Sequence, residues 1–376
     1  MGAMTARDVV AVALVGFAAL GAILVHGRPL TWTHWMTHFA AIEALPVLVG
    51  LGIAGAFVEA TRGQPRRAVW FVAGLSVVAL SWPLVGASAQ YRRRGRTFSI
   101  ARWVGFDDLP PVAVKKDVAL APELPDLLAD VYTGVGEGPR PFVLVIHGGS
   151  WRSGDKGEVP HASRAIAAAG ITVFDLRYRL SGQARFPAAV ADVKCALGKI
   201  RANASLFGID PARSALLGRS AGAHLALLAG YSAGDARLPP TCGVDDAPVS
   251  KIVAIYPPTD LAWCHANPFV PDVGDGISAI EAWLGGTPAE VPDVYALASP
   301  TSHVRADAPP TLVVTGSGDG VVRSDNARFI ADAFVKHGRK ADVVVIPDAE
   351  HGFDVRNGGI GEQFSRQEIL AFLADL

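Results

Sequence analysis

The sequence contains few charged residues and few cysteines. Only 18% of its 376 residues are charged, and basic and acidic residues nearly cancel, to a net charge of −1. This balance gives no case for a nucleic acid partner, because binding to phosphates relies on an excess of basic residues. The spacing of the cysteines, Cys195, Cys242 and Cys264, matches no metal site. The sequence shows no internal repeat and no low-complexity linker, which argues against a repeat array.

Long hydrophobic stretches are present and lie near the N-terminus. Half of the chain is hydrophobic, and residues 9–25, 39–58 and 68–89 each approach the ~20 residues that a bilayer-spanning helix needs. A cleaved signal peptide would account for one such stretch but not for three in series. We therefore expect residues 1–96 to form a membrane region with three transmembrane helices.

The ends of these stretches carry residues that favour the membrane interface. Tryptophan side chains prefer the headgroup region, and here they occupy positions 32, 35, 70 and 82. Glu43 lies inside the second stretch, where an ionisable group is costly, so it either has a role or reaches the headgroups. The arginines between Arg92 and Arg96 are expected to anchor the chain to anionic membrane lipid.

The orientation in the membrane depends on how basic residues are divided. Three spans would place the N-terminus and the second loop on one side, and everything after residue 90 on the other. The first side has Arg7, Arg62, Arg66 and Arg67, and the second has Arg28, Arg92, Arg93, Arg94 and Arg96. The count slightly favours a cytoplasmic C-terminal domain. If that domain faced outward, Cys242 and Cys264 could pair, whereas Cys195 is expected to be a small buried hydrophobic residue.

The remaining residues, 97–376, show the alternation typical of an α/β fold. Short β-branched runs alternate with helical patterns, which predicts a mostly parallel sheet with helices on both faces. The expected strands are 141–149, 171–178, 214–220, 251–258, 311–319 and 342–351. The expected helices are 159–169, 187–206, 224–229, 326–337 and 362–376, with caps at Gly170, Gly208 and Gly338. Residues 262–303 lack a clear strand and are expected to form a cap or lid.

Within this domain, the segment LLGRSAGAH places one serine between two glycines, directly after an apolar strand. Gly218-Arg219-Ser220-Ala221-Gly222 then leads into a helix, which is the context of a G-x-S-x-G nucleophile elbow. The glycines leave room for a sharp turn that projects the hydroxyl above the sheet. The N-terminus of the following helix offers N–H groups to developing negative charge. We therefore predict that Ser220 is a catalytic nucleophile.

A serine nucleophile needs a base, and the base needs a partner that fixes its tautomer. Asp319 and His351 each follow an expected strand, and they give the chain order Ser, Asp, His that this type of site requires. Asp325 is a rival for the acid but is expected to cap a helix. His337 and His303 are rivals for the base but lie in helix or cap contexts. We predict Asp319 and His351 as the other catalytic residues.

The segment HGGSW, residues 147–151, follows an early strand, at the place where such folds keep a glycine-rich oxyanion loop. Each donor in an oxyanion hole is typically worth about 3 kcal/mol at the transition state. Gly148 is an alternative donor. We assign the oxyanion hole to the backbone N–H groups of Gly149, Ser150 and Ala221.

Taken together, these segments resemble α/β-hydrolases of the esterase and lipase type. The resemblance runs from about Asp117 to the C-terminus. It is strongest to feruloyl-esterase-like and hormone-sensitive-lipase-like carboxylesterases with an HGG-W loop, with kynurenine formamidase as a neighbour. The matching segments are HGGSW, FDLRYRL, FPAAVADVKCAL, GIDPARSALLGRSAGAHLALL, IYPPTDL, LGGTPAEVPDVYALASPTSHV, PPTLVVTGSGDGVV and AEHGFD. The resemblance implies an α/β-hydrolase fold and a serine esterase.

Two positions depart from the family pattern. Ala223 stands where such enzymes often have glycine, and Ser150 stands where many have a third glycine. Each adds a small side chain near the oxyanion hole. The sequence therefore does not define the size of the acyl pocket, but the expected reaction class is unchanged. Trp151 is a candidate substrate contact with packing as an equal alternative. His224 is a weaker candidate, because its place inside the helix is more typical of a structural residue.

The sequence therefore predicts a membrane-anchored serine hydrolase that cleaves small-molecule or lipid-like carboxylic esters. Ser220 would attack the carbonyl, His351 would transfer the proton and Asp319 would orient His351, with no metal or organic cofactor required. An acyltransferase using the same acyl-enzyme, an arylformamidase-like amide hydrolase and a non-catalytic scaffold are the alternatives. Product partition between water and an added alcohol would separate hydrolysis from acyl transfer. Substrate identity and oligomeric state are left open.

Overall fold

A computed structural model describes residues 5–26, 31–61, 66–106, 109–269, 271–272 and 274–376. Two arginines of the orientation count, Arg28 and Arg62, lie outside the described residues. The chain divides into two compact units. The first is residues 1–98 with 347–350, and the second is residues 99–346 with 351–376.

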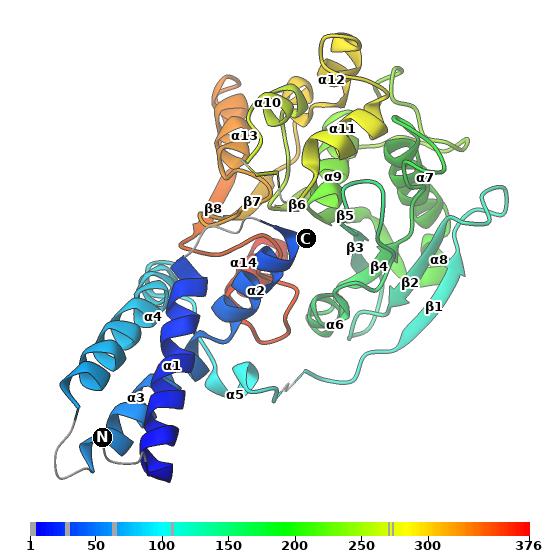
Figure 1. Cartoon of the computed structure of the whole chain (residues 1–376). Coiled ribbons are helices and arrows are strands. Elements are labelled where there is room, and N and C mark those ends of the chain that lie inside the picture. The colour runs from blue at the N-terminus through cyan, green and yellow to red at the C-terminus, as the bar shows by residue number, and fades with distance from the viewer. Residues whose placement is uncertain (1–4, 27–30, 62–65, 107–108, 270, 273) are drawn as a thin grey trace. The chain divides into compact units, whose positions relative to one another are not determined.

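The first unit consists of helices α1 (Ala6–His26), α2 (Trp32–Glu43), α3 (Leu45–Ala60) and α4 (Arg67–Arg93) (Figure 1). Helices α1 and α4 are each long and apolar enough to cross a bilayer. The second expected span, 39–58, is not one straight helix, because α2 and α3 meet at a bend of 71°. Pro46 at the start of α3 explains the break, since proline lacks an N–H and its ring clashes with the preceding helical turn.

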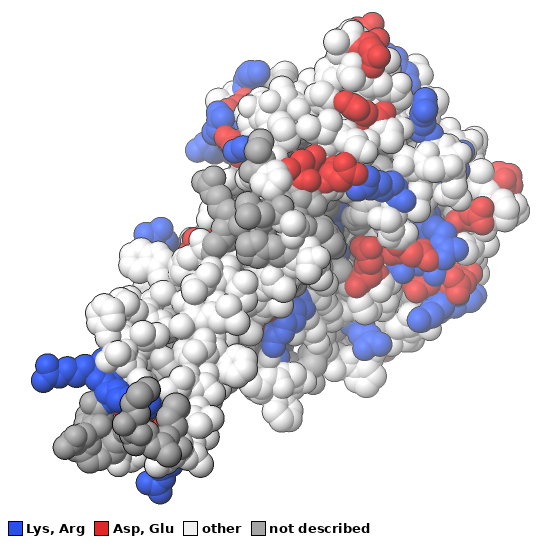
Figure 2. Space-filling view, in the orientation of Figure 1, with Lys and Arg blue, Asp and Glu red and all other residues white. Residues whose placement is uncertain are grey.

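Small residues lie where these helices meet, and large apolar residues point outward. An added Cβ would lie 2.6 Å from the end of the Leu48 side chain at Gly21, and 2.7 Å from the Val15 side chain at Gly55, so a larger residue at either position would require a shift of its neighbour. The outward side chains are 62–71% exposed at Phe17, Ile23, Phe57, Phe71 and Trp82. Figure 2 shows that much of the visible surface of these helices is uncharged, with basic residues towards their ends.

The acidic residues within these helices, Asp8, Glu43 and Glu59, are all buried. The Glu59 carboxylate accepts three hydrogen bonds from Arg66, from the backbone N at 2.6 Å, Nε at 3.2 Å and Nη2 at 2.9 Å. Asp8 lies 3.9 Å from the same guanidinium. Glu43, whose role the sequence leaves open, is also buried and is the last residue of α2.

The second unit is built on one eight-stranded sheet of order β1-β2-β4-β3-β5-β6-β7-β8. Its strands are β1 (Val114–Ala119), β2 (Leu128–Tyr132), β3 (Arg140–Ile146), β4 (Thr172–Leu176), β5 (Ile209–Arg219), β6 (Lys251–Ile255), β7 (Thr311–Gly316) and β8 (Asp342–Ile346). Strand β2 pairs antiparallel with β1 and β4, and all the other pairs are parallel. The predicted mostly parallel α/β fold is confirmed, and β1 and β2 are additions that the sequence analysis did not foresee.

The helices of this unit follow the expected alternation. They are α5 (Ile100–Trp103), α6 (Pro160–Ala168), α7 (Ala188–Ala202), α8 (Ala204–Phe207), α9 (Ala221–Tyr231), α13 (Asp325–Val335) and α14 (Ile360–Leu373). Gly170, Gly208 and Gly338 all have positive φ, as helix-terminating glycines do. The expected cap region is helical: it contains α10 (Leu261–Ala266), α11 (Gly276–Leu284), α12 (Pro292–Ala298) and the 3₁₀-helix η1 (Pro300–His303), with α10 to α12 grouped on one side of the sheet (Figure 1).

The cysteine pairing differs from the expectation. Cys195 and Cys242 form a disulfide with 5.5 Å between their Cα atoms, and Cys264 is free. The suggested Cys242–Cys264 pair and the view of Cys195 as a plain hydrophobic residue are therefore wrong. The reason is that α7, which carries Cys195, runs beside the segment around Cys242, where the Thr241 N–H donates to the Ala191 carbonyl at 3.0 Å.

Candidate active site

Ser220 lies at the sharp turn between β5 and α9. Its φ of 52° and ψ of −121° are unfavourable for a residue with a side chain, as expected of a nucleophile elbow. The flanking glycines are required by space. A Cβ at Gly218 would lie 2.1 Å from the Gly222 carbonyl oxygen, and one at Gly222 would lie 2.2 Å from that of His147. The elbow is thus held between β5, α9 and the end of β3.

The structure brings Ser220, His351 and Asp319 together. His351 Nε2 lies 3.0 Å from Ser220 Oγ, and His351 Nδ1 lies 2.8 Å from Asp319 Oδ2. The other oxygen of Asp319 accepts the backbone N–H groups of Val321 at 2.9 Å and Val322 at 2.8 Å. The aspartate side chain is fully buried, with one oxygen held by amides of its own loop after β7 and the other facing His351 in the loop after β8.

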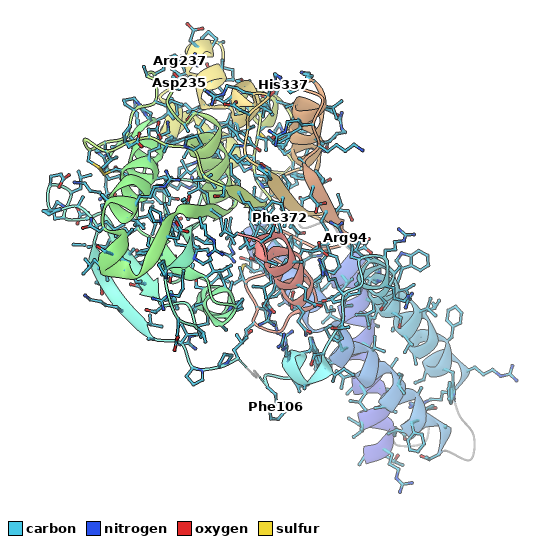
Figure 3. All side chains as sticks on the ribbon, turned by 180° about the vertical axis from the view of Figure 1, so that it is seen from behind. Arg94, Phe106, Asp235, Arg237, His337 and Phe372 are labelled. Carbon is cyan, nitrogen blue, oxygen red and sulfur yellow. A yellow bond between two sulfur atoms is a disulfide. The ribbon has the colours of Figure 1, made fainter. Side chains whose placement is uncertain are left out.

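The rival acid and bases lie elsewhere. Asp325 is the first residue of α13, where Ser324 holds the N-cap position, and it lies 3.6 Å from the Arg328 guanidinium. His337 is exposed just after α13 (Figure 3). His303 is buried in η1, where its Nε2 lies 2.8 Å from the Leu297 carbonyl oxygen. None of these contacts includes Ser220.

The HGGSW segment forms a tight loop after β3. Gly149, Ser150 and Trp151 have positive φ values of 102°, 53° and 57°. A Cβ at Gly149 would lie 2.1 Å from the Ser153 carbonyl oxygen, so this position tolerates only glycine. Beneath the loop, the His147 ring stacks on Tyr178 at 4.3 Å, and burial lowers its pKa to about 4, which keeps it neutral.

The predicted oxyanion donors differ in whether they border the cleft. Ser150 and Ala221 line the cavity beside Ser220. Burial raises the pKa of Glu158, and a hydrogen bond from the Gly148 amide offsets part of that rise. Of the predicted oxyanion donors, Ser150 and Ala221 are among the residues that line the cleft, whereas Gly149 and the alternative Gly148 are not.

A cleft with an empty volume of about 650 Å³, counted with its open mouth, extends from Ser220 towards the cap. Its apolar wall includes Trp263, Phe269, Ile277, Ile280, Val321 and Val322. Arg323 also lines it, but its Nε donates to the Asn267 carbonyl at 3.0 Å and its guanidinium lies 4.5 Å from the Phe269 ring centroid. Within the described parts of the chain, no cluster of three or more His, Cys, Asp or Glu residues could hold a metal.

The two candidate substrate contacts have different positions. Trp151 lines the cleft and stacks on Trp283 of α11, with 4.7 Å between ring centroids. His224 does not reach the cleft, because its fully buried ring lies between Trp151 Nε1 at 3.4 Å and the Ala298 carbonyl oxygen at 2.7 Å. Burial lowers its pKa to about 4. His224 therefore ties the elbow helix to the cap, in line with the structural role that the sequence favoured over a substrate contact.

A buried ion pair beside the site escaped the sequence analysis. Arg219, the residue before the nucleophile, lies with its Nε 2.5 Å from Asp354 Oδ2, and both side chains are at most 6% exposed. Tyr256 donates its hydroxyl to the other carboxylate oxygen of Asp354 at 2.6 Å. The Tyr256 ring also lies 4.4 Å from the His351 ring. These contacts join the elbow to the loop that carries His351.

Known esterases are similar to this chain in sequence. Esterase LipC of Mycobacterium tuberculosis (strain ATCC 25618 / H37Rv) is 33% identical over 227 residues, which cover 58% of this chain and 55% of LipC. Esterase LipQ of the same organism is 28% identical over 277 residues, 69% of this chain and 64% of LipQ. This chain therefore spans between about half and two thirds of the length of these curated relatives.

The solved structures and the family comparison agree on the fold. The crystal structure of esterase LipW from Mycobacterium marinum has a TM-score of 0.58 and 23% identity, covering 78% of this chain and 86% of LipW. The BD-FAE family model matches residues 129–334. Because that match covers more than half of the chain, the protein belongs to the BD-FAE family.

Proposed function

We propose that this protein is a serine hydrolase that cleaves carboxylic esters through an acyl-enzyme on Ser220. The observation that carries the proposal is the hydrogen-bonded chain from Ser220 Oγ through His351 to Asp319, with distances of 3.0 and 2.8 Å, at the floor of an open cleft. The esterase names of LipC and LipQ support the same reaction class.

The geometry assigns a role to each group. Asp319 accepts from Nδ1 of His351, which leaves Nε2 as the acceptor for the Ser220 proton. As the hydroxyl attacks, negative charge develops on the carbonyl oxygen, and the N–H groups of Ser150 and Ala221 beside Ser220 can receive it. His351 then returns the proton to the leaving alcohol, and water resolves the acyl-enzyme by the same route.

Labelling with a fluorophosphonate probe tests this proposal. The detergent-solubilised protein is expected to label and to hydrolyse p-nitrophenyl esters, and Ser220→Ala is expected to do neither. Ser205→Ala is the control and is expected to label like the wild type, because that serine is exposed on α8 and is not among the residues that line the cleft. Equal labelling of the wild type and Ser220→Ala would contradict the proposal.

We also propose that the first unit anchors the enzyme in a membrane. The support is the length and apolar composition of α1 and α4, together with large exposed side chains such as Phe17, Phe71 and Trp82. The protein is expected to sediment with membranes and to resist extraction by alkaline carbonate, whereas residues 99–376 expressed alone are expected to leave the membrane fraction. Release of the full chain by carbonate would refute the anchor.

The disulfide favours a catalytic unit on the outward side of that membrane. The count of arginines, in contrast, slightly favours the cytoplasmic side. Disulfides such as Cys195–Cys242 persist in oxidising compartments and are rare in the cytosol. Cells are quenched with acid, and the denatured, unreduced protein is treated with polyethylene-glycol maleimide. One adduct, on Cys264, is expected, whereas three adducts would place the unit in a reducing compartment.

A further inference from the structure

The short helix α5, at the start of the second unit, is fixed to that unit by one side only. The Ser99 N–H donates to the Gln363 side chain at 2.8 Å, and the Gln363 side chain donates back to the Ser99 carbonyl at 3.0 Å. Arg356 donates to the Trp103 carbonyl at 2.9 Å and lies 5.3 Å from the centroid of the Trp103 ring. These contacts hold α5 in a defined orientation on the surface.

The opposite side of α5 carries large apolar side chains in contact with solvent. Ile100 is 70% exposed, Val104 is 54% exposed and Phe106 is 73% exposed. Ile100 and Val104 are four residues apart and so lie on one helical face. Figure 3 shows Phe106 projecting from the ribbon beside α5. Three such residues within one turn and its C-terminal extension form an apolar patch of the kind that marks a binding surface.

The chain that leads into this patch is basic. Residues 92–106 include five arginines and no acidic residue, and two aspartates, Asp107 and Asp108, follow directly after Phe106. One of the arginines, Arg102, belongs to α5 itself. An apolar face preceded by a run of arginines is typical of segments that lie in the headgroup region of an anionic bilayer, with the aliphatic and aromatic groups below the phosphates.

The chain itself keeps α5 close to the bilayer. Six residues separate Arg93, the end of α4, from Ile100, and an extended chain of that length reaches at most roughly 25 Å. The backbone is not fully extended there, because the Arg96 N–H donates to the Tyr91 carbonyl at 2.7 Å. A patch on so short a tether meets lipid at a very high effective concentration, even where its own affinity is weak.

We propose that the exposed face of α5, formed by Ile100, Val104 and Phe106, inserts into the surface of the bilayer that α4 crosses. This inference rests on the proposed membrane anchor and adds a second point of attachment, which belongs to the catalytic unit itself. Continuity with α4 and the run of arginines favour lipid over a partner protein as the occupant. Arg356 and Trp103 join α5 to the segment after His351. The attachment would therefore hold the catalytic unit to the membrane at a point close in sequence to the loop that carries His351.

Site-specific fluorescence in nanodiscs tests the proposal. Single cysteines replace Ile100, Phe106, Leu206 or Phe71 in a Cys264→Ala background, and each is labelled with an environment-sensitive dye. Leu206 on α8 is a matched exposed leucine, 77% exposed, at a site with no proposed lipid contact. Phe71 is an outward residue of α4, 68% exposed, and reports on the anchor itself. Nanodiscs with anionic lipid are prepared with and without a nitroxide-labelled lipid.

The expected result is a blue-shifted emission that is lost with nitroxide lipid at Ile100→Cys, Phe106→Cys and Phe71→Cys, but not at Leu206→Cys. Quenching at Phe71→Cys without quenching at Ile100→Cys and Phe106→Cys would overturn the α5 proposal and leave the anchor intact. A blue shift at α5 without quenching would indicate a protein contact and would also overturn it. Absence of quenching at all four sites would refute the anchor, and this inference with it.

Discussion

The buried pair between Arg219 and Asp354 makes a sharp prediction about stability. Asp354→Asn removes the negative charge but keeps the size of the side chain, and it leaves the guanidinium of Arg219 buried without a counter-ion. Removing one partner of a buried pair typically costs about 3–5 kcal/mol. For a domain of this size, that corresponds to a fall in melting temperature of roughly 6–15 °C.

A double-mutant cycle separates the pair from general damage. Arg219→Met is expected to cost a similar amount, because it leaves the carboxylate of Asp354 with only the Tyr256 hydroxyl at 2.6 Å. The double variant Arg219→Met/Asp354→Leu removes both charges and fills the space with apolar groups. Its loss of unfolding free energy is expected to fall short of the sum of the single losses by about 1–3 kcal/mol.

The assay is unfolding of the solubilised protein in urea at pH 7, followed by tryptophan fluorescence and by far-UV circular dichroism. Arg328→Met, at an exposed ion pair on α13, is the control and is expected to cost less than about 1 kcal/mol. Additive losses in the double variant, or a loss at Asp354→Asn no larger than at the control, would refute the reasoning. In either case the two groups would not act as a buried pair.

Three further predictions concern catalysis, the disulfide and acid. Asp319→Asn is expected to lower kcat by roughly 10⁴-fold with little change in KM, because the amide favours the wrong tautomer of His351, and steady-state kinetics on a p-nitrophenyl ester will measure it. The double variant Cys195→Ser/Cys242→Ser is expected to lose about 4 kcal/mol in urea unfolding, as the disulfide closes a segment with a sequence separation of 47; a reducing agent should then destabilise only the wild type. Burial lowers the pKa values of His147 and His224 to about 4 in the folded protein, so below pH 6.5 the unfolded chain binds more protons than the folded protein. The free energy of unfolding is therefore expected to fall from pH 6.5 towards pH 4, by up to about 3 kcal/mol per histidine. His224→Gln should flatten this urea-midpoint profile, and His337→Gln, at an exposed site, should not.

The parts of the fold that the sequence predicted are those with a strong local signal. The strands from β3 to β7 are buried on both faces over most of their length, so each appears as a near-continuous apolar run. Strand β8, DVVVI, has the same kind of run although Val345 is exposed at the sheet edge. Strand β1 was missed because its residues, VKKDVA, are mostly exposed at the sheet edge and lack such a run. The bend between α2 and α3 was missed because hydropathy averages over Pro46, which breaks a helix without making the stretch less apolar.

The candidate site was predictable because each of its groups follows a strand. In a parallel sheet the carboxyl ends of the strands meet at one edge, so Ser220, Asp319 and His351 could be placed together from the chain order alone. The disulfide had no comparable signal. Cys195 lies within a helix and Cys242 in an irregular segment, and only the packing of α7 against that segment brings their Cα atoms to 5.5 Å.

The Arg219–Asp354 pair shows that burial alone predicts the kind of partner and its segment, but not the residue. Arg219 ends a central strand and stands directly before a nucleophile whose surroundings must exclude water, so its charge is expected to be buried. A buried guanidinium requires an acidic partner. The partner has to come from a segment that reaches the same edge of the sheet, and the loop after β8 brings His351 there. That loop holds three acidic residues, Asp348, Glu350 and Asp354. The structure identifies Asp354 as the partner, with its Oδ2 2.5 Å from Arg219 Nε. The nucleophile and its base are therefore joined twice, once through the catalytic hydrogen bond and once through an ion pair between their immediate neighbours.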